Sequence, residues 1–398
     1  MGKIKGIKSR EVLDSLGDPA IEVKVILECG IVGLATTASI NSRLVNHSII
    51  NRDGDMSRFR GLGLRWAMHD MNKTILPAVL NRNVLDQISI DAILSEISEA
   101  ENGKNISKLL ILSVSLAIAR AAANLQKLPL YSWIRVIARN LKCHQPPTSF
   151  YENITVPFPI ANMLTGNSAK HKNLDFKGFS IVPTGAKTIM NGIEMISSVW
   201  HGLRDRLEIT GDDIGISALG GFAPRLNSNR ESIRLLEESI NSSGYKLEKE
   251  ISIYVEVSAN KLFEEGLYIL HHPRMDLNSK EMVELLNNWV DNHSVNYIED
   301  GIADKDLKGW ESLRKSVGNQ CQLVGDSLFS SISNSLTHYP IGSLSNAILI
   351  HLSDDGTITD CIRRVFRSFN NGLKIIIAGQ GGDSTDSSIV DFAVAMNA

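Results

Sequence analysis

The sequence lacks the features that would assign it to a secreted, disulfide-stabilised or membrane-embedded class. Its four cysteines, Cys29, Cys143, Cys321 and Cys361, lie far apart and form no CxxC pair, which is typical of reduced, structural thiols. No uninterrupted apolar run approaches the ~18 residues that a membrane span needs. The amino-terminal Met-Gly-Lys-Ile-Lys is not followed by the apolar segment of a signal peptide. We therefore expect a cytoplasmic protein without a membrane-spanning segment.

An excess of charge of one sign is also missing. The 398 residues include 41 Lys and Arg and 44 Asp and Glu, a net charge of −3, so nothing predicts binding to nucleic acid or to an anionic membrane. There is no internal repeat at solenoid spacing and no low-complexity tract. A chain of this length is expected to form two domains, or one barrel with an appended domain.

The first part of the chain changes from a strand pattern to a helix pattern. Residues 3–37 alternate between apolar and polar side chains and are interrupted by turn residues, which predicts a three-stranded antiparallel meander. From Gly63 onward the apolar spacing is helical, and Leu109–Arg120 is apolar nearly all round, which predicts a buried helix. The polar, proline-containing residues 142–153 are interpreted as a linker between an α+β domain at 1–141 and a second domain at 154–398.

The second part alternates strand and helix patterns. Helices are predicted at 186–208 and 228–243. The predicted strands are 156–164, 178–183, 251–257, 295–299, 321–325, 346–352 and 373–378. This order predicts a parallel α/β sheet with right-handed crossovers, one strand short of a closed eight-stranded barrel.

Three predicted strands end in a carboxylate: Glu256, Glu299 and Asp326. Because functional groups collect at the carboxyl ends of parallel strands, these acids could meet around one hard cation. Oxygen-only ligation suits Mg²⁺ or Mn²⁺. The alternative is that each acid is a solvated loop cap, but three acids at matching positions favour the metal site.

Short sequence words along the whole chain resemble those of enolase, the glycolytic phosphopyruvate hydratase. They include Arg10-Glu-Val-Leu-Asp-Ser, Ser57-Arg-Phe, Pro183-Thr-Gly-Ala-Lys-Thr, Gly220-Gly-Phe-Ala-Pro, Ile298-Glu-Asp-Gly, Leu323-Val-Gly-Asp and Asn346-Ala-Ile-Leu-Ile. The resemblance implies an enolase-like ββαα(βα) TIM barrel with an amino-terminal α+β lid domain, commonly assembled as a dimer. We expect the eighth barrel strand to be missing, because the sequence stops at Ala398 just after the preceding helix.

The resemblance also implies a chemistry and a set of site residues. In enolases a lysine removes a proton beside a carboxylate, two Mg²⁺ stabilise the enolate, and a glutamate assists the loss of hydroxide. The three metal-binding acids fall on Glu256, Glu299 and Asp326, although the first is normally an aspartate. A lid-loop serine that binds the second metal aligns with Ser42, and the base lysine aligns with His351.

Other residues of the enolase site are replaced here. The two acid glutamates fall on Gly178 and Leu219, and a substrate-contacting histidine falls on Ala169. The His-Arg-Ser cluster that holds carboxylate and phosphate is replaced by Gly379-Gln380-Gly381. General acid or base catalysis contributes about 10² to 10⁴ in rate, so we expect dehydration of 2-phosphoglycerate to be absent or residual.

Three hypotheses follow from this pattern. The first is an inactive or impaired enolase homologue that retains Mg²⁺ affinity, at one site rather than two. The second is an active enolase-family lyase that dehydrates 2-phosphoglycerate or acts on another small carboxylate or phosphorylated acid, with Mg²⁺ and with His351 as base. The third is a non-catalytic protein that associates with itself, with an intact enolase or with another protein.

Overall fold

The computed structural model describes residues 2–37, 52–99, 106–142, 146, 148–166, 174–212, 214–217, 220–332, 341–379 and 382–398. These residues form two compact units. The first contains Met1–Pro157, Ile350–Asn370 and Ile375–Ala398, and the second contains Phe158–Leu349 and Asn371–Lys374. Most residues after 349 therefore belong to the same compact unit as the amino-terminal part of the chain.

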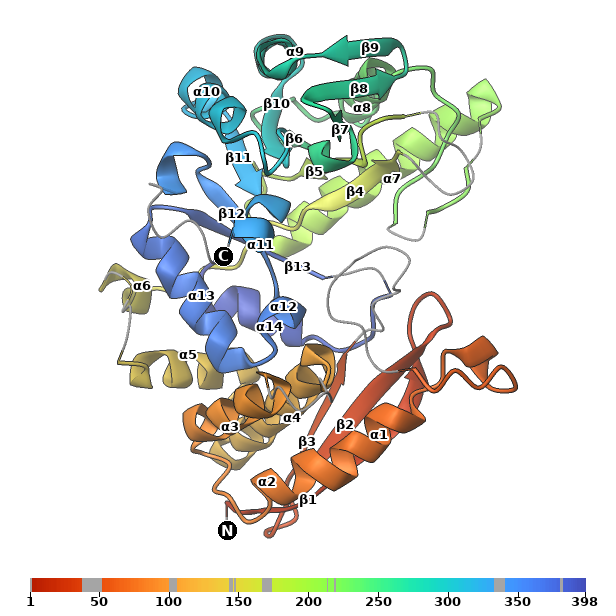
Figure 1. The fold of residues 1–398 in the computed structure, drawn as a ribbon. Helices are drawn as coiled ribbons and strands as arrows, with labels where there is room; N and C mark the ends of the chain where they lie inside the picture. The colour runs from red at the N-terminus through yellow and green to blue at the C-terminus, as the bar shows by residue number, and fades with distance from the viewer. Residues whose placement is uncertain are drawn as a thin grey trace. The chain divides into compact units, whose positions relative to one another are not determined.

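The first unit begins with the predicted meander. Its strands are β1 (Ile4–Leu13), β2 (Pro19–Leu27) and β3 (Val32–Thr37), each antiparallel to the next (Figure 1). A Cβ built on Gly33 would lie 2.0 Å from the Ala117 carbonyl oxygen. Glycine at this position therefore lets β3 approach the neighbouring helix α4 (Lys108–Gln126) closely.

Helix α4 is the buried helix that the sequence predicts. Its first turn is capped by Ser107, whose side chain accepts a hydrogen bond from the Leu109 N–H, and it ends at Lys127 in the left-handed conformation. Among the described helices, α4 alone has the length and apolar composition of a membrane span, and 78% of its most apolar window is buried inside the structure. Such burial is expected of a core helix.

Further helices complete the first unit. In the amino-terminal part they are η1 (Phe59–Gly61), α1 (Arg65–Asp70), η2 (Met71–Ile75), α2 (Leu76–Val79), α3 (Gln87–Glu99), α5 (Leu130–Asn140) and α6 (Ser149–Glu152). The carboxyl-terminal segments contribute α12 (Leu352–Asp355), α13 (Ile358–Asn370) and α14 (Ser388–Ala395). Within this unit α13 packs on α3, α4 and α5, and α14 packs on α5.

The large sheet has the strand order β13-β12-β11-β10-β6-β5-β4 in the described part of the chain. Its strands are β4 (Ala161–Thr165), β5 (Gly178–Val182), β6 (Ser252–Glu256), β10 (Val295–Glu299), β11 (Gln322–Gly325), β12 (Ala347–His351) and β13 (Lys374–Ala378). Adjacent strands from β6 through β10 and β11 to β12 are parallel, whereas β4 with β5 and β5 with β6 are antiparallel.

A wholly parallel pattern was therefore wrong for the first two strands, and the ββαα order implied by the resemblance is correct. No helix separates β4 from β5 in the described residues, and direct connections suit antiparallel strands. Two helices, α7 (Ile189–Thr210) and α8 (Asn229–Ser242), separate β5 from β6. Because the second helix reverses the direction of the first, β6 starts where β5 ended and runs antiparallel to it.

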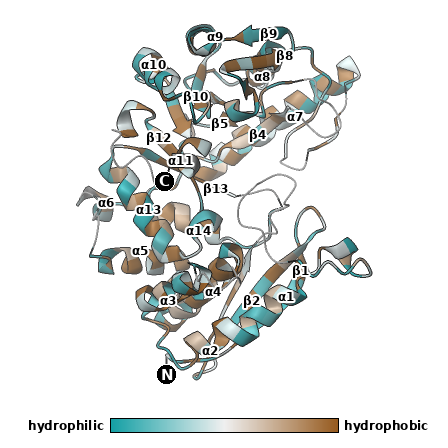
Figure 2. Ribbon diagram, viewed as in Figure 1, coloured by the Kyte–Doolittle hydropathy of each residue, from teal (hydrophilic) through white to brown (hydrophobic). Residues whose placement is uncertain are grey.

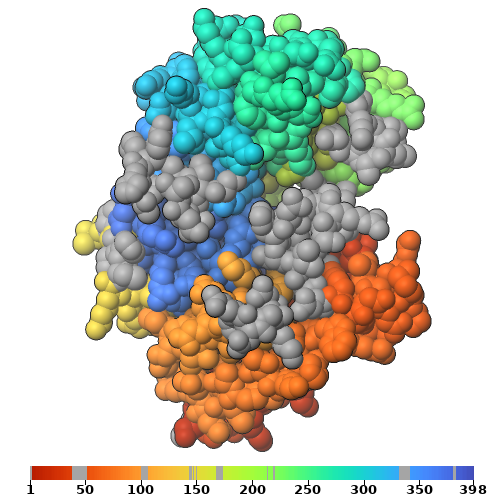
Figure 3. Space-filling model, viewed as in Figure 1, coloured from red at the N-terminus to blue at the C-terminus, as the bar shows by residue number. Residues whose placement is uncertain are grey.

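The remaining elements of the second unit cover or connect these strands. They are η3 (Ala259–Lys261), β7 (Phe263–Glu264), β8 (Leu267–His271), β9 (Arg274–Leu277), α9 (Ser279–Asn292), α10 (Leu307–Val317), α11 (Ser327–Ile332) and η5 (Ile341–Ser343). Figure 2 shows hydrophilic and hydrophobic residues on both α9 and α10, as expected of helices with one buried face. The β7–β9 sheet and α9 form much of this unit's visible surface in Figure 3. This small sheet was not among the strands predicted from the sequence.

Candidate functional site

The three predicted metal-binding acids lie at the same edge of neighbouring strands. Glu256 and Glu299 are the last residues of β6 and β10 and face each other in the parallel register. Glu299 also pairs with Val324 of β11, and Asp326 follows two residues later. The strand ends that carry the three acids are therefore neighbours in the second unit, and the metal role of the acids stays a prediction.

Backbone hydrogen bonds hold this edge together. The Val257 N–H donates to the Glu299 carbonyl oxygen at 3.0 Å, and the Asp300 N–H donates to the Val324 carbonyl oxygen at 2.9 Å. Each of these bonds links a residue just beyond one strand to the next strand. The positions of the acids thus depend on the sheet itself.

Asp300 is a buried residue that positions Asp326 and was not among the predicted site residues. Its carboxylate accepts hydrogen bonds from the backbone N–H groups of Asp326 and Ser327, both at 3.0 Å, and from the Ser327 hydroxyl at 2.7 Å. Burial and the charge of Asp326 raise the pKa of Asp300 to about 6. Asp300 therefore caps the start of α11 and fixes the backbone at Asp326.

Lys177 is the second feature that the sequence analysis missed. This residue directly precedes β5, and its backbone N–H donates to the Glu256 carbonyl oxygen at 2.9 Å. Its ammonium group forms a hydrogen-bonded ion pair with a Glu256 carboxylate oxygen. Burial alone would lower the pKa of Lys177, but the pair with Glu256 and the charges of Glu299 and Asp326 outweigh burial and raise it. The ion pair with Glu256 therefore favours the charged form of the lysine.

Glu299 is bound by a neighbouring phenol. The Tyr254 hydroxyl donates a hydrogen bond to one Glu299 carboxylate oxygen. Burial, followed by the charges of Glu256, Asp300 and Asp326, raises the pKa of Glu299 well above its usual value, although the Tyr254 bond opposes this shift. Tyr254 is itself held by stacking on Tyr297, with ring centroids 5.7 Å apart.

The arrangement of these side chains does not fit a magnesium ion. Mg²⁺ requires near-octahedral oxygen ligands at about 2.0–2.1 Å. Here one Glu256 oxygen is bonded to the Lys177 ammonium and one Glu299 oxygen to the Tyr254 hydroxyl. Within the described ranges no group of three or more His, Cys, Asp and Glu side chains is arranged to hold a metal ion. One carboxylate oxygen of Glu256 and one of Glu299 are therefore already engaged with protein donors.

The other predicted site residues belong to the first unit or lie outside the described part of the chain. His351 belongs to the first unit, where its Nδ1 lies 3.2 Å from the Ala378 carbonyl oxygen. Ser42, Ala169 and Leu219 lie outside the described residues. Their roles remain predictions.

The described part of the glycine-rich loop that begins at Gly379 is bonded to strand β3 of the same unit through its own polar side chains. The Asp386 carboxylate accepts from the Thr36 N–H at 2.9 Å and from the Ser388 N–H at 2.8 Å. The Ser384 hydroxyl donates to the Thr36 carbonyl oxygen at 3.2 Å. These bonds support a structural role for residues 382–388, whereas Gln380 and Gly381 lie outside the described part of the chain.

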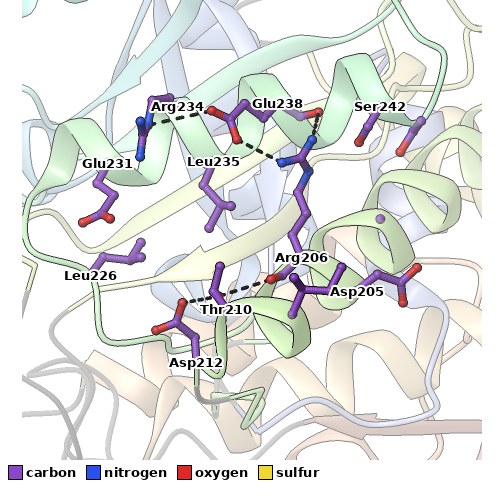
Figure 4. A pocket seen from close by; sticks show the side chains of 13 residues that line it. Asp205, Arg206, Thr210, Asp212, Leu226, Glu231, Arg234, Leu235, Glu238 and Ser242 are labelled. Atoms are coloured by element: carbon purple, nitrogen blue, oxygen red, sulfur yellow. Dashed lines mark hydrogen bonds and ion pairs between the residues drawn. The ribbon is translucent and has the colours of Figure 1, made fainter.

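A separate cavity of about 610 Å³ lies between α7 and α8 (Figure 4). Two arginines of its lining pair with one glutamate: Arg206 donates to the Glu238 carboxylate at 3.0 Å, and Arg234 lies 3.9 Å from the same carboxylate. The strand-end acids do not line it. It is a groove between α7 and α8 in which both arginines pair with Glu238.

The match to known families agrees with this fold. Residues 4–134 match the model of the enolase N-terminal domain, and residues 153–398 match the model of the enolase C-terminal TIM barrel domain. Together these matches cover most of the chain. The protein belongs to the enolase family.

Proposed function

We propose that this chain is an enolase-family member in which the dehydration of 2-phosphoglycerate is lost or reduced to a residual rate. The observation that supports this most directly is Gly178, which starts β5 and faces Glu256 in the antiparallel register. A Cβ built on Gly178 would lie 3.4 Å from a Glu256 carboxylate oxygen. The resemblance assigns an acid glutamate to this position, but the residue here has no side chain to donate a proton.

The residues around Gly178 do not supply a substitute acid. Lys177 is paired with Glu256, and its raised pKa means that it gives up a proton less readily than an ordinary lysine. The Tyr254 hydroxyl is directed to Glu299, and burial is the main cause of its strongly raised pKa. Neither group is suited to assist the departure of hydroxide at neutral pH.

An assay of 2-phosphoglycerate turnover with Mg²⁺ tests this proposal. We expect kcat/KM at least about 10⁴-fold below that of an intact enolase measured in parallel, because an acid and a base are both replaced. The signal is the appearance of phosphoenolpyruvate. Turnover within tenfold of the intact enzyme would contradict the proposal.

The alternative, an active lyase that uses Mg²⁺ and His351, makes a different prediction. If His351 is the base, His351→Gln should remove about 10² or more of any residual rate, together with the acidic limb of its pH profile. We expect no such loss, because the acid that the resemblance assigns to position 178 is replaced by glycine, so a base alone would lack its catalytic partner. A Mg²⁺-dependent rate that falls in His351→Gln would favour the lyase.

A further inference from the structure

We propose that Lys177 is a built-in counter-ion for Glu256, Glu299 and Asp326 and takes the place of a divalent cation at this site. The proposal goes beyond the loss of catalysis, because it concerns what neutralises the acids in the resting protein. It makes the carboxylate cluster a structural feature of the second unit that is independent of metal.

The backbone around Lys177 fixes where its side chain can reach. Its N–H bonds to the Glu256 carbonyl oxygen, and the next residue, Gly178, pairs with Glu256 across β5 and β6. The lysine therefore leaves the backbone beside the carboxylate to which its ammonium is bonded. Because Gly178 has no side chain, nothing at that position separates the ammonium from the acids.

Charge gives the second argument. Carboxylates at adjacent strand ends repel one another, and Glu256 and Glu299 are direct register partners in β6 and β10. The Lys177 ammonium is bonded to Glu256, whose strand end lies beside that of Glu299. It thus supplies positive charge at the point where the acids converge, and the Tyr254 hydroxyl supplies a donor to Glu299.

Competition follows from these contacts. A divalent cation placed among the same acids would have to displace the ammonium from Glu256 and the phenol from Glu299. The positive charge of the Lys177 ammonium would also repel the divalent cation. Since Mg²⁺ gives up its hydration water reluctantly, we expect its affinity for the wild-type protein to be weak.

The test is a calorimetric titration with MgCl₂ on the full chain, with NaCl at matched ionic strength as reference. Lys177→Met removes the charge and keeps the length of the side chain. We expect Lys177→Met to bind Mg²⁺ at least about tenfold more tightly than wild type, and the further change Glu256→Gln to remove the gain. Equal affinity of wild type and Lys177→Met, whether tight or weak, would overturn the proposal.

Two further lysines serve as controls. Lys280 lies on α9, largely exposed and paired with Glu284, so Lys280→Met should bind Mg²⁺ as wild type does. Lys261 is near enough for the charges of Lys177 and Glu256 to affect its pKa, which burial mainly lowers. Lys261→Met retains the Lys177–Glu256 pair. A gain in Lys261→Met as large as in Lys177→Met would show a general charge effect and contradict the proposed role of Lys177.

Thermal stability gives a second readout that does not depend on turnover. Without metal, Lys177→Met should melt below wild type, and MgCl₂ should raise its melting temperature while leaving wild type unchanged. Lys177→Arg retains the charge and should need no metal. If Lys177→Met folds only poorly, recovery of folded protein by MgCl₂ but not by NaCl supports the proposal, and failure of MgCl₂ to recover it counts against the proposal. Both the Mg²⁺ titration and the melting temperatures can be interpreted whether or not the protein turns over 2-phosphoglycerate.

Discussion

Replacing Asp91 by alanine is expected to lower the free energy of unfolding by about 4 kcal/mol, because several buried donors would lose their acceptor. Asp91 lies on α3 and is 1% exposed. Its carboxylate accepts hydrogen bonds from Gln87 at 2.9 Å, from the Ser115 hydroxyl at 2.8 Å, and from the Thr359 N–H and hydroxyl at 3.1 and 2.6 Å. Through Thr359 this network attaches α13 to α3 and α4 within the first unit.

Denaturant unfolding of Asp91→Ala measures this loss. The matched control is Glu96→Ala, which changes an exposed residue of the same helix. The control should lie within about 0.5 kcal/mol of wild type, as expected of an exposed site. A similar result for Asp91→Ala would mean that the network does not stabilise the native state.

Asp91 also predicts an unusual pH dependence. Burial raises its pKa to about 6, although its hydrogen bonds act in the opposite direction. The native state therefore binds this proton more tightly than the unfolded chain, and its contribution to stability is lost as the pH rises from about 4 to about 6. A pKa of about 6 in place of a usual value near 4 corresponds to about 3 kcal/mol of stability. The destabilisation caused by Asp91→Asn should thus be smaller at pH 7 than at pH 4.

The elements that depend on local pattern could be predicted from the sequence. The meander, the buried helix α4 and the strand ends that carry Glu256, Glu299 and Asp326 follow from side-chain periodicity. The convergence of the acids follows from strand pairing. These features need only the spacing of residues within one element and the direction of neighbouring strands.

The polar contacts that decide how the site is used could not be predicted in this way. Lys177 precedes a strand, where an isolated lysine is normally solvated, and its partner Glu256 is 79 residues away. Asp91 occupies a helix, where an acid is normally exposed, and Thr359 is 268 residues away. Such pairs depend on how distant segments pack, and a single sequence does not reveal that.

The carboxyl-terminal loop gives a second large effect, with the opposite dependence on pH. Asp386 has a side chain that is 7% exposed and accepts two hydrogen bonds from the Arg120 guanidinium, at 2.9 and 3.0 Å. It also accepts from Thr36 and Ser388. Removing one partner of such a buried pair costs about 3 kcal/mol or more, so Asp386→Ala should destabilise the first unit by this amount. Arg120→Lys, which retains the charge but not the bidentate geometry, should cost less.

The sign of the pH effect separates the two aspartates. Burial raises the pKa of Asp386, but the hydrogen bonds from Arg120 and Ser388 and the Arg120 charge outweigh burial and leave the pKa below its usual value. The stabilisation is therefore present above the unfolded pKa near 4 and is lost as the pH falls through the folded pKa. Denaturant unfolding at pH 3 and pH 7 should show that Asp386→Asn loses more stability at pH 7, whereas the cost of Asp91→Asn falls between pH 4 and pH 7. The same trend in both variants would mean that the ion pair with Arg120 does not determine the charge state of Asp386.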